Sequence, residues 1–249
     1  MDSTNADTEM GSMEVRLHDA PGNYEEVNVF VESVQINRTE SDEGWVTINE
    51  PNQQYNLLEL TNGAYEVIGE AVLEAGTYNQ MRLILSREDN NVVIAGEEHD
   101  LFIPSGSQTG IKLNINAEIQ DDITYVLLLD FDADRSVVKT GNDASPVNYL
   151  LKPVIRASNE AETGNIDGIV SPVDAKAAVY AINDTDTLST TYANVESGEF
   201  RLVGLEEGSY TVSVEASEEG YETTNIEDVA VIVSETSDIG VIELETSTE

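Results

Sequence analysis

The sequence predicts an all-β protein made of two antiparallel β-sandwich domains. Three observations support this fold class. Apolar and polar residues alternate with period two along most of the chain, and β-branched residues fill these runs. No long stretch has the period of about 3.6 residues that marks an amphipathic helix. The residues that tight turns need, glycine, proline, asparagine and aspartate, gather between the runs.

Ten alternating runs in the first part of the chain are predicted strands. They lie at residues 13–17, 27–37, 45–48, 65–73, 78–86, 92–95, 100–103, 111–119, 125–131 and 147–155. The stretch YNLLELTNG at residues 55–63 breaks the alternation and ends in Asn-Gly, which predicts a single helical turn.

Seven shorter runs follow a polar stretch that contains no apolar residue except alanine, SNEAETGN at residues 158–165. The shorter runs lie at residues 166–170, 177–182, 188–192, 199–203, 209–216, 229–233 and 239–244. Short strands this close together are typical of a small β-sandwich. We therefore expect a disordered leader at 1–12, a larger sandwich at 13–157, a linker at 158–164 and a smaller sandwich at 165–249.

Two segments resemble each other where a new strand begins, LEAGTY at residues 73–78 and LEEGSY at residues 205–210. The glycine permits a tight turn, and the tyrosine starts the next strand. We expect the rings of Tyr78 and Tyr210 to point inward and their hydroxyls to bond the backbone of the turn, as in a tyrosine corner.

The chain is strongly acidic, with 49 acidic and 11 basic residues and a net charge of -38. This charge repels polyanions, so we expect no nucleic-acid partner and no direct binding to an anionic membrane. Self-repulsion costs stability, and molar salt relieves it by shortening the screening length to about 3 Å. A salt-adapted, halophilic microbial source is therefore a hypothesis.

Cysteine is absent, which excludes disulfides, thiolate metal sites and cysteine nucleophiles. No apolar stretch approaches the roughly 20 residues of a membrane span, and residues 1–15 lack the basic and apolar regions of a signal peptide. Either the protein is cytoplasmic or its sequence begins after a removed export segment.

The first part of the chain resembles the Domain of Unknown Function 4382 family over residues 13–157. The resemblance rests on MEVRLHDAPGNYEEVNVFVESVQI, WVTI, NLLELTNG, LEAGTYNQMRLIL, IPSGSQTGIKL, LLLDFDADRSVV and YLLKPVIR, in that order. It implies an exported bacterial or archaeal protein, often a lipoprotein, without a known activity. We accordingly expect an extracellular or cell-surface location, peripheral to the membrane through a removed or unseen lipid anchor.

The last part of the chain is similar to carboxypeptidase regulatory-like domains over residues 164–246. The likeness rests on GNIDGIVSPVDAKAAVYAIN, SGEFRLVGLEEGSYTVSVEASEEGYE and DIGVIEL. It implies a prealbumin-like sandwich, related in architecture to the immunoglobulin fold, that serves as a spacer or docking module and carries no catalytic residues.

Asp130, Asp132 and Asp134 alternate at the end of an apolar run. An EF-hand is excluded, because Arg135 and Gly141 occupy the positions of its glycine and glutamate. On a strand the three carboxylates would share one face about 6 to 7 Å apart, and a nearby cation would have to relieve their repulsion. Three interpretations remain: a solvated or arginine-paired strand end, a Ca²⁺ site formed by these residues, or a catalytic carboxylate group.

Other motifs give weaker signals. His18 and His99 have no partner at zinc-site spacing, so we expect both on turn surfaces. The stretch PSGSQTGIK lacks the Gly-Lys-Ser/Thr of a P-loop, and no G-x-S-x-G motif is present. Trp45, Tyr24 and Tyr55 are the aromatic residues that a core explains least, and they are the candidate ligand-binding residues for a glycan.

The sequence therefore predicts a non-catalytic structural or adhesive binding module of a salt-adapted microbe, secreted or on the cell surface, and calcium stabilisation is one of the interpretations of its three aspartates. Its expected partner is a cell-surface protein or a glycan, and its edge strands could pair between copies. The alternative is a glycan-binding accessory module of a surface polysaccharide-utilisation complex. A hydrolase with paired carboxylates ranks last, because a small sandwich seldom offers the cleft that such a pair needs.

Overall fold

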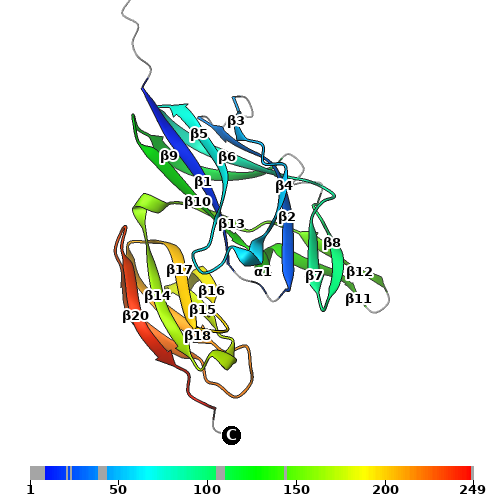
Figure 1. Cartoon of the computed structure of the whole chain (residues 1–249), viewed down its shortest axis with the longest axis vertical. Coiled ribbons are helices and arrows are strands. Elements are labelled where there is room, and N and C mark those ends of the chain that lie inside the picture. The colour runs from blue at the N-terminus through cyan, green and yellow to red at the C-terminus, as the bar shows by residue number, and fades with distance from the viewer. Residues whose placement is uncertain are drawn as a thin grey trace, which may run out of the picture.

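The chain folds almost entirely into β-strands, as the computed structural model shows (Figure 1). It describes residues 9–20, 22, 24–38, 44–104, 110–142 and 145–247. Two bodies of packed sheets follow one another along the long axis of the molecule (Figure 1). The predicted all-β sandwich class is therefore confirmed. We call β1 to β13 the N-terminal unit and β14 to β20 the C-terminal unit.

The N-terminal unit consists of two sheets. The first contains β1 (Met10–Ala20), β5 (Glu66–Glu74), β10 (Thr124–Asp132) and β13 (Ile155–Asn159), in the order β13-β10-β1-β5. The second contains β2 (Glu26–Asn37), β3 (Val46–Asn49), β4 (Gln53–Asn56), β6 (Gly76–Leu85), β7 (Asn91–Ile94), β8 (Glu97–Phe102), β9 (Ile111–Ile119), β11 (Val137–Asn142) and β12 (Ser145–Leu151). Its order is β11-β12-β8-β7-β2-β6-β9, and β3 and β4 also pair with β2.

The core of the N-terminal unit lies between these sheets and explains the alternation in the sequence. Met13, Val15 and Leu17 of β1 are fully buried in it, together with Leu129 and Phe131 of β10. The residues between them point to the opposite face of the first sheet. That opposite face is directed toward the C-terminal unit.

The C-terminal unit has two smaller sheets and a core of its own. Its strands are β14 (Thr163–Ser171), β15 (Ala178–Asn183), β16 (Asp186–Tyr192), β17 (Glu199–Glu206), β18 (Gly208–Glu215), β19 (Thr224–Val231) and β20 (Thr236–Glu243). They form the sheets β17-β14-β20 and β16-β15-β18-β19. Ile166, Val179, Leu202, Leu205 and Val212 are fully buried between them.

Four short helical turns complete the described elements: η1 (Leu57–Glu59), α1 (Ala133–Ser136), η3 (Glu160–Glu162) and η4 (Val173–Ala175). The predicted turn in YNLLELTNG is η1, and the side chain of Asn56 accepts a hydrogen bond from its first turn. In the part of the chain that the structure describes, no helix has the length and hydropathy to cross a membrane.

Both tyrosine corners form as predicted. The Tyr78 hydroxyl donates to the carbonyl of Glu74 at 3.2 Å, and the Tyr210 hydroxyl donates to the carbonyl of Glu206 at 2.9 Å. Both rings are buried. Each corner therefore fixes the start of one strand, β6 in the N-terminal unit and β18 in the C-terminal unit.

Three of the strand pairs that the structure describes are parallel, although an antiparallel arrangement was predicted throughout. These are β1 with β10, β8 with β12, and β14 with β20. The sequence could not reveal this, because the alternation of side chains is the same in both kinds of pair. The parallel pairing of β1 with β10 brings the carboxyl ends of two strands together at the junction between the units.

Two predicted boundaries differ from the observed ones. β1 begins at Met10, inside the expected leader, whereas residues 1–8 lie outside the described residues. The expected linker at 158–164 is occupied by the end of β13, by η3 and by the start of β14. Polar residues predicted a loop there, but the chain passes from β13 through η3 directly into β14. The two units are consequently joined by a single helical turn.

Gly198 illustrates how closely two backbones approach in the C-terminal unit. It has a φ of +76°, and a Cβ at this position would lie 2.3 Å from the carbonyl oxygen of Val170. Gly240 has a similar φ of +74° with no atom within 4 Å of that position. The two glycines thus share a backbone conformation and differ in free space.

We expect Gly198→Ala to lower the free energy of unfolding by about 3 kcal/mol, from left-handed strain plus overpacking. Gly240→Ala should cost about 1 kcal/mol, from strain alone. Urea denaturation of both variants measures the difference. Equal losses of unfolding free energy in the two variants would show that the backbone at Gly198 moves enough to accommodate the added methyl group.

Candidate functional site

A row of three side chains lies across the face of the first sheet that meets the C-terminal unit. His18 of β1 is the register partner of Asp130 on β10, and Asp130 is the partner of Arg156 on β13. The carboxylate of Asp130 accepts from the Arg156 Nη2 at 3.3 Å. Only 9% of the Asp130 side chain is exposed, so this is a largely buried ion pair.

Arg156 connects the two units. Its Nη1 donates to the carbonyl oxygen of Gly204 at 2.8 Å, and its Nη2 donates to that of Val203 at 3.3 Å. Both carbonyls belong to β17 of the C-terminal unit. Gly204 has a φ of +66°, and a Cβ there would lie 3.0 Å from the Cδ2 atom of Leu128. The Arg156 guanidinium therefore pairs with Asp130 in the N-terminal unit and donates hydrogen bonds to the backbone of the C-terminal unit.

His18 is buried in this junction, so the prediction of a turn-surface histidine was wrong for this residue. Only 2% of it is exposed, because the C-terminal unit covers the sheet face on which it lies. Neither ring nitrogen has a hydrogen-bond partner in the described structure, and its Nδ1 lies 3.8 Å from Asp130 Oδ1. Burial, together with the positive charge of Arg156, lowers the pKa of His18 to about 4. The imidazole is thus neutral at neutral pH and forms no ion pair.

His99 also lies elsewhere than predicted. It belongs to β8 instead of a turn, and its ring is tilted against that of Tyr149 with centroids 5.0 Å apart. The aromatic contact explains its partial burial without a metal ligand role.

The three aspartates selected from the sequence have three different environments. Asp130 pairs with Arg156, whereas Asp132 caps α1 by accepting from the Arg135 backbone N–H at 2.9 Å. Asp134 lies within α1 and is exposed. The strand ends at Asp132, so the expected row of three on one strand face does not form. All three nevertheless line a cavity of about 650 Å³ between the units.

Metal binding gains no support from this geometry. Among the described residues, no group of three or more His, Asp or Glu side chains is arranged to hold a metal ion. Burial raises the pKa of both Asp130 and Asp132, although Arg156 and Arg135 respectively act against this rise. The calcium site at Asp130, Asp132 and Asp134 stays a prediction.

Asp19 lies beside the Asp130 row, on the core face of β1, and was not selected from the sequence. It is fully buried, and its Oδ1 accepts from the backbone N–H of Ala133 at 3.0 Å. Its Oδ2 has no hydrogen-bond partner in the described structure. Burial, and then the charges of Asp130, Asp132 and Asp134, raises the pKa of Asp19 well above its usual range. The signal was available, because Asp19 continues the core-facing series of Met13, Val15 and Leu17.

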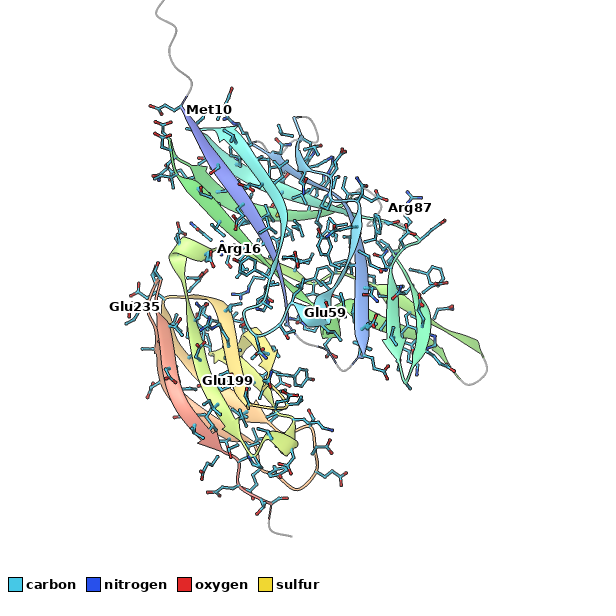
Figure 2. All side chains as sticks on the ribbon, viewed as in Figure 1. Met10, Arg16, Glu59, Arg87, Glu199 and Glu235 are labelled. Carbon is cyan, nitrogen blue, oxygen red and sulfur yellow. The ribbon has the colours of Figure 1, made fainter. Side chains whose placement is uncertain are left out.

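Two further contacts fix the junction. The Asn62 Oδ1, in the loop after η1, accepts from Thr191 Oγ1 at 2.7 Å and from the Arg201 backbone N–H at 3.3 Å. Arg16 of β1 donates to Glu160 of η3 at 2.5 Å. Figure 2 shows Arg16 at the boundary between the two units. Polar groups from three separate segments of the N-terminal unit therefore contact the C-terminal unit or the turn leading into it.

The candidate glycan-binding aromatic residues do not come together. Tyr55 is a core residue with 6% exposure, so it cannot stack against a sugar. Tyr24 packs against the same core, and burial raises its pKa. The ring of Trp45 is covered by the Arg82 guanidinium, 4.4 Å from its centroid, with the Lys112 ammonium at 5.9 Å. Packing against the nearest sheet explains all three aromatic side chains.

The chemistry of the junction follows from these pairings. Asp130 is bound to Arg156, and His18 is uncharged at neutral pH. The row therefore holds two units together instead of presenting an acid and a base to a substrate. A second cavity of about 440 Å³, lined in part by His18, Tyr65 and Arg201, lies on the other side of the row.

Comparison with known proteins identifies one family. A family model described as a domain of unknown function (DUF4382) matches residues 10–153. A search of curated proteins finds no match.

Solved structures with some similarity include two pilins. The Bacillus anthracis TIE protein is 15% identical, with 96% of this chain and 34% of that chain covered and a TM-score of 0.25. This chain thus spans about a third of that protein's length. GBS52, the minor pilin of Streptococcus agalactiae, is 12% identical, with 95% and 97% covered and a TM-score of 0.25. A double mutant of the shaft pilin SpaA from Lactobacillus rhamnosus GG is 8% identical, with 97% and 99% covered and a TM-score of 0.26. These TM-scores are too low to say anything of this chain's function.

The burial of His18 predicts a specific pH dependence of stability. Its pKa of about 4 in the folded state lies below its ordinary value of 6.5, so between these values the unfolded chain binds a proton that the folded chain does not. The free energy of unfolding should therefore fall by about 3 kcal/mol from this residue as pH drops from 6.5 to 4. The raised pKa values of Asp19 and Asp130 act in the opposite direction.

Comparison of the wild type with His18→Gln isolates this contribution. Urea denaturation at several pH values should show a smaller acid-induced loss of unfolding free energy in His18→Gln than in the wild type. An identical pH dependence of the two proteins would contradict the assignment of a buried neutral His18.

Proposed function

The chain belongs to the DUF4382 family, and we propose that it is a non-catalytic structural or adhesive binding module, secreted or displayed on the cell surface. The observation that carries the proposal is the bridge from Asp130 through Arg156 to the carbonyls of Val203 and Gly204. This bridge joins the face of one sandwich directly to a strand of the other. A module that spaces or presents a partner needs such a fixed orientation between its parts.

The connection between the units supports the same role. β13 ends at Asn159, η3 follows, and β14 begins at Thr163. Few freely rotating residues therefore separate the two units, in contrast to the flexible linkers that let domains move independently. The contacts of Asn62 and Arg16 add restraints on either side of this connection.

The acidic surface supports adaptation to salt, and the location outside the cell rests on the resemblance to exported family members. The net charge of -38 is distributed over both units and keeps the protein soluble where salt screens the repulsion. Membrane attachment through a lipid anchor belongs to the proposal through the resemblance to exported family members. So does the assignment of the C-terminal unit as a carboxypeptidase regulatory-like spacer. The glycan-binding alternative has no specific observation in its favour, since Trp45 is covered and Tyr55 is buried.

The rigidity of the junction is the testable core of the proposal. In the wild type, residual dipolar couplings from both units should fit one alignment tensor. In the double variant Arg156→Met with Asn62→Ala, two tensors should be needed, because the side chains that bond β16 and β17 directly are gone and, among the described contacts of the junction, only the Arg16–Glu160 pair remains. Arg156→Met should also lower the free energy of unfolding by about 3 kcal/mol, since it leaves Asp130 buried without its cation.

A matched control removes the same chemical groups within one unit. Arg38→Met removes a guanidinium that bonds the carbonyl of Glu74, and Asn49→Ala removes an amide that bonds the carbonyl of Ile68. This double variant should keep a single tensor. Two independent tensors in the wild type would overturn the proposed rigid module.

Calcium stabilisation is the part of the proposal that rests on the sequence alone. A protein that binds calcium through Asp130, Asp132 and Asp134 should melt at a higher temperature in calcium chloride than in sodium chloride of equal ionic strength. Asp134→Ala, which alters an exposed residue, should abolish the difference. Equal melting temperatures in the two salts would remove calcium from the proposal and leave the rigid junction untouched.

A further inference from the structure

The largest of the described cavities is a groove beside two unpaired strand edges. Its volume is about 880 Å³, and it is lined by residues of β9 on one side and of β13 on the other. β9 has β6 as its only partner among the described strands, and β13 has only β10. The outer edge of each strand therefore presents backbone N–H and C=O groups that lack a strand partner.

The floor and the rim of this groove differ in chemistry. Apolar and aromatic side chains form the floor: Ile115, Tyr125, Leu127 and Ala157. Burial and then the nearby charge of Glu162 raise the pKa of Tyr125 to about 12, which reflects a half-buried ring beside a carboxylate. Carboxylates form the rim: Glu118, Glu162, Glu206 and Glu207. None of the described residues that line the groove is basic.

We propose that this groove binds an extended, basic peptide segment of a partner protein, which adds as a strand to the edge of β9. β9 spans nine residues, so it offers the longer of the two edges. In such an added strand, alternate side chains point inward and outward. Aliphatic side chains would cover the floor at Ile115 and Tyr125, and lysine or arginine side chains would meet the glutamates of the rim.

Charge decides between this occupant and a second copy of the chain. The chain carries 49 acidic and 11 basic residues, so one copy approaching the acidic rim of another is repelled. A basic segment is attracted by the same rim, and its attraction weakens as salt screens it. The proposal names a partner for the binding module proposed above and rests on it. The two proposals can be contradicted independently, because the alignment tensors test the rigid junction and peptide binding tests the groove.

The probe is an acetylated and amidated octapeptide of alternating lysine and valine. We expect saturable binding by calorimetry that weakens at least about tenfold from 50 to 500 mM salt, because it depends on charge. A glutamate-valine peptide should not bind. A lysine-valine peptide with two central prolines should bind at least about tenfold more weakly, because proline cannot donate a backbone hydrogen bond.

Variants of the groove locate the binding. Glu118→Lys with Glu162→Lys should weaken binding at least about tenfold, while the control Glu98→Lys with Glu227→Lys, of equal charge on exposed strand positions outside the groove, should weaken it much less. Ala157→Phe should abolish peptide binding, because the larger ring fills the floor of the groove. Ala230→Phe, at an exposed position of β19, should leave peptide binding unchanged. Amide hydrogen exchange supplies a readout of strand addition, since β9 amides should gain protection on binding and β19 amides should not.

Three results would overturn the proposal. Equal binding of the proline and the parent peptides would show that no strand is added. Equal weakening by the groove and the control variants would show attraction to the acidic surface in general. A concentration-dependent dimer that Ala157→Phe abolishes would show that a second copy fills the groove.

Discussion

The structure depends on one interaction, the pairing of a buried carboxylate with a guanidinium that also binds the backbone of the neighbouring unit. Asp130 would be costly to bury alone, since an unpaired charge loses its hydration without compensation. Arg156 supplies the compensating charge, and its Nη1 and Nη2 atoms also donate to the carbonyls of Gly204 and Val203, respectively. Both partners belong to the N-terminal unit, and the carbonyls that Arg156 bonds belong to the C-terminal unit, so the pair couples the two sandwiches.

The surroundings of this pair show the energetic cost of burying polar groups. His18 stays neutral because burial and Arg156 both disfavour its charged form. Asp19 is held beside three other carboxylates with one oxygen unpartnered, and its pKa is raised accordingly. Burial of His18 and Asp19 lowers the free energy of unfolding. The close packing of β17 against Leu128 raises it. A junction made of hydrogen bonds and ion pairs restricts the relative orientation of the two units more than an apolar contact does. The reason is that a hydrogen bond forms only within a narrow range of distances and angles.

Sequence reasoning succeeded for local features and failed for those that depend on contacts between distant segments. The alternation gave the strands, and the Gly-x-Tyr turns gave both tyrosine corners with their hydroxyl bonds. Polar residues at 158–164 suggested a linker, although they belong to strands and one helical turn. His18 was expected on a turn surface because it has no partner at zinc-site spacing, and only the second unit buries it.

The sequence alone determined the all-β class, the family, the strong negative charge and the positions of most strands, since periodicity and composition are local properties of the chain. The tertiary structure decided which strands are parallel, that Asp130 meets Arg156 and His18, and that Trp45 lies under Arg82. It also decided that β9 and β13 leave two edges open beside a groove. These features arise from pairing between segments far apart in the chain, and side-chain alternation is the same whichever strand becomes the neighbour.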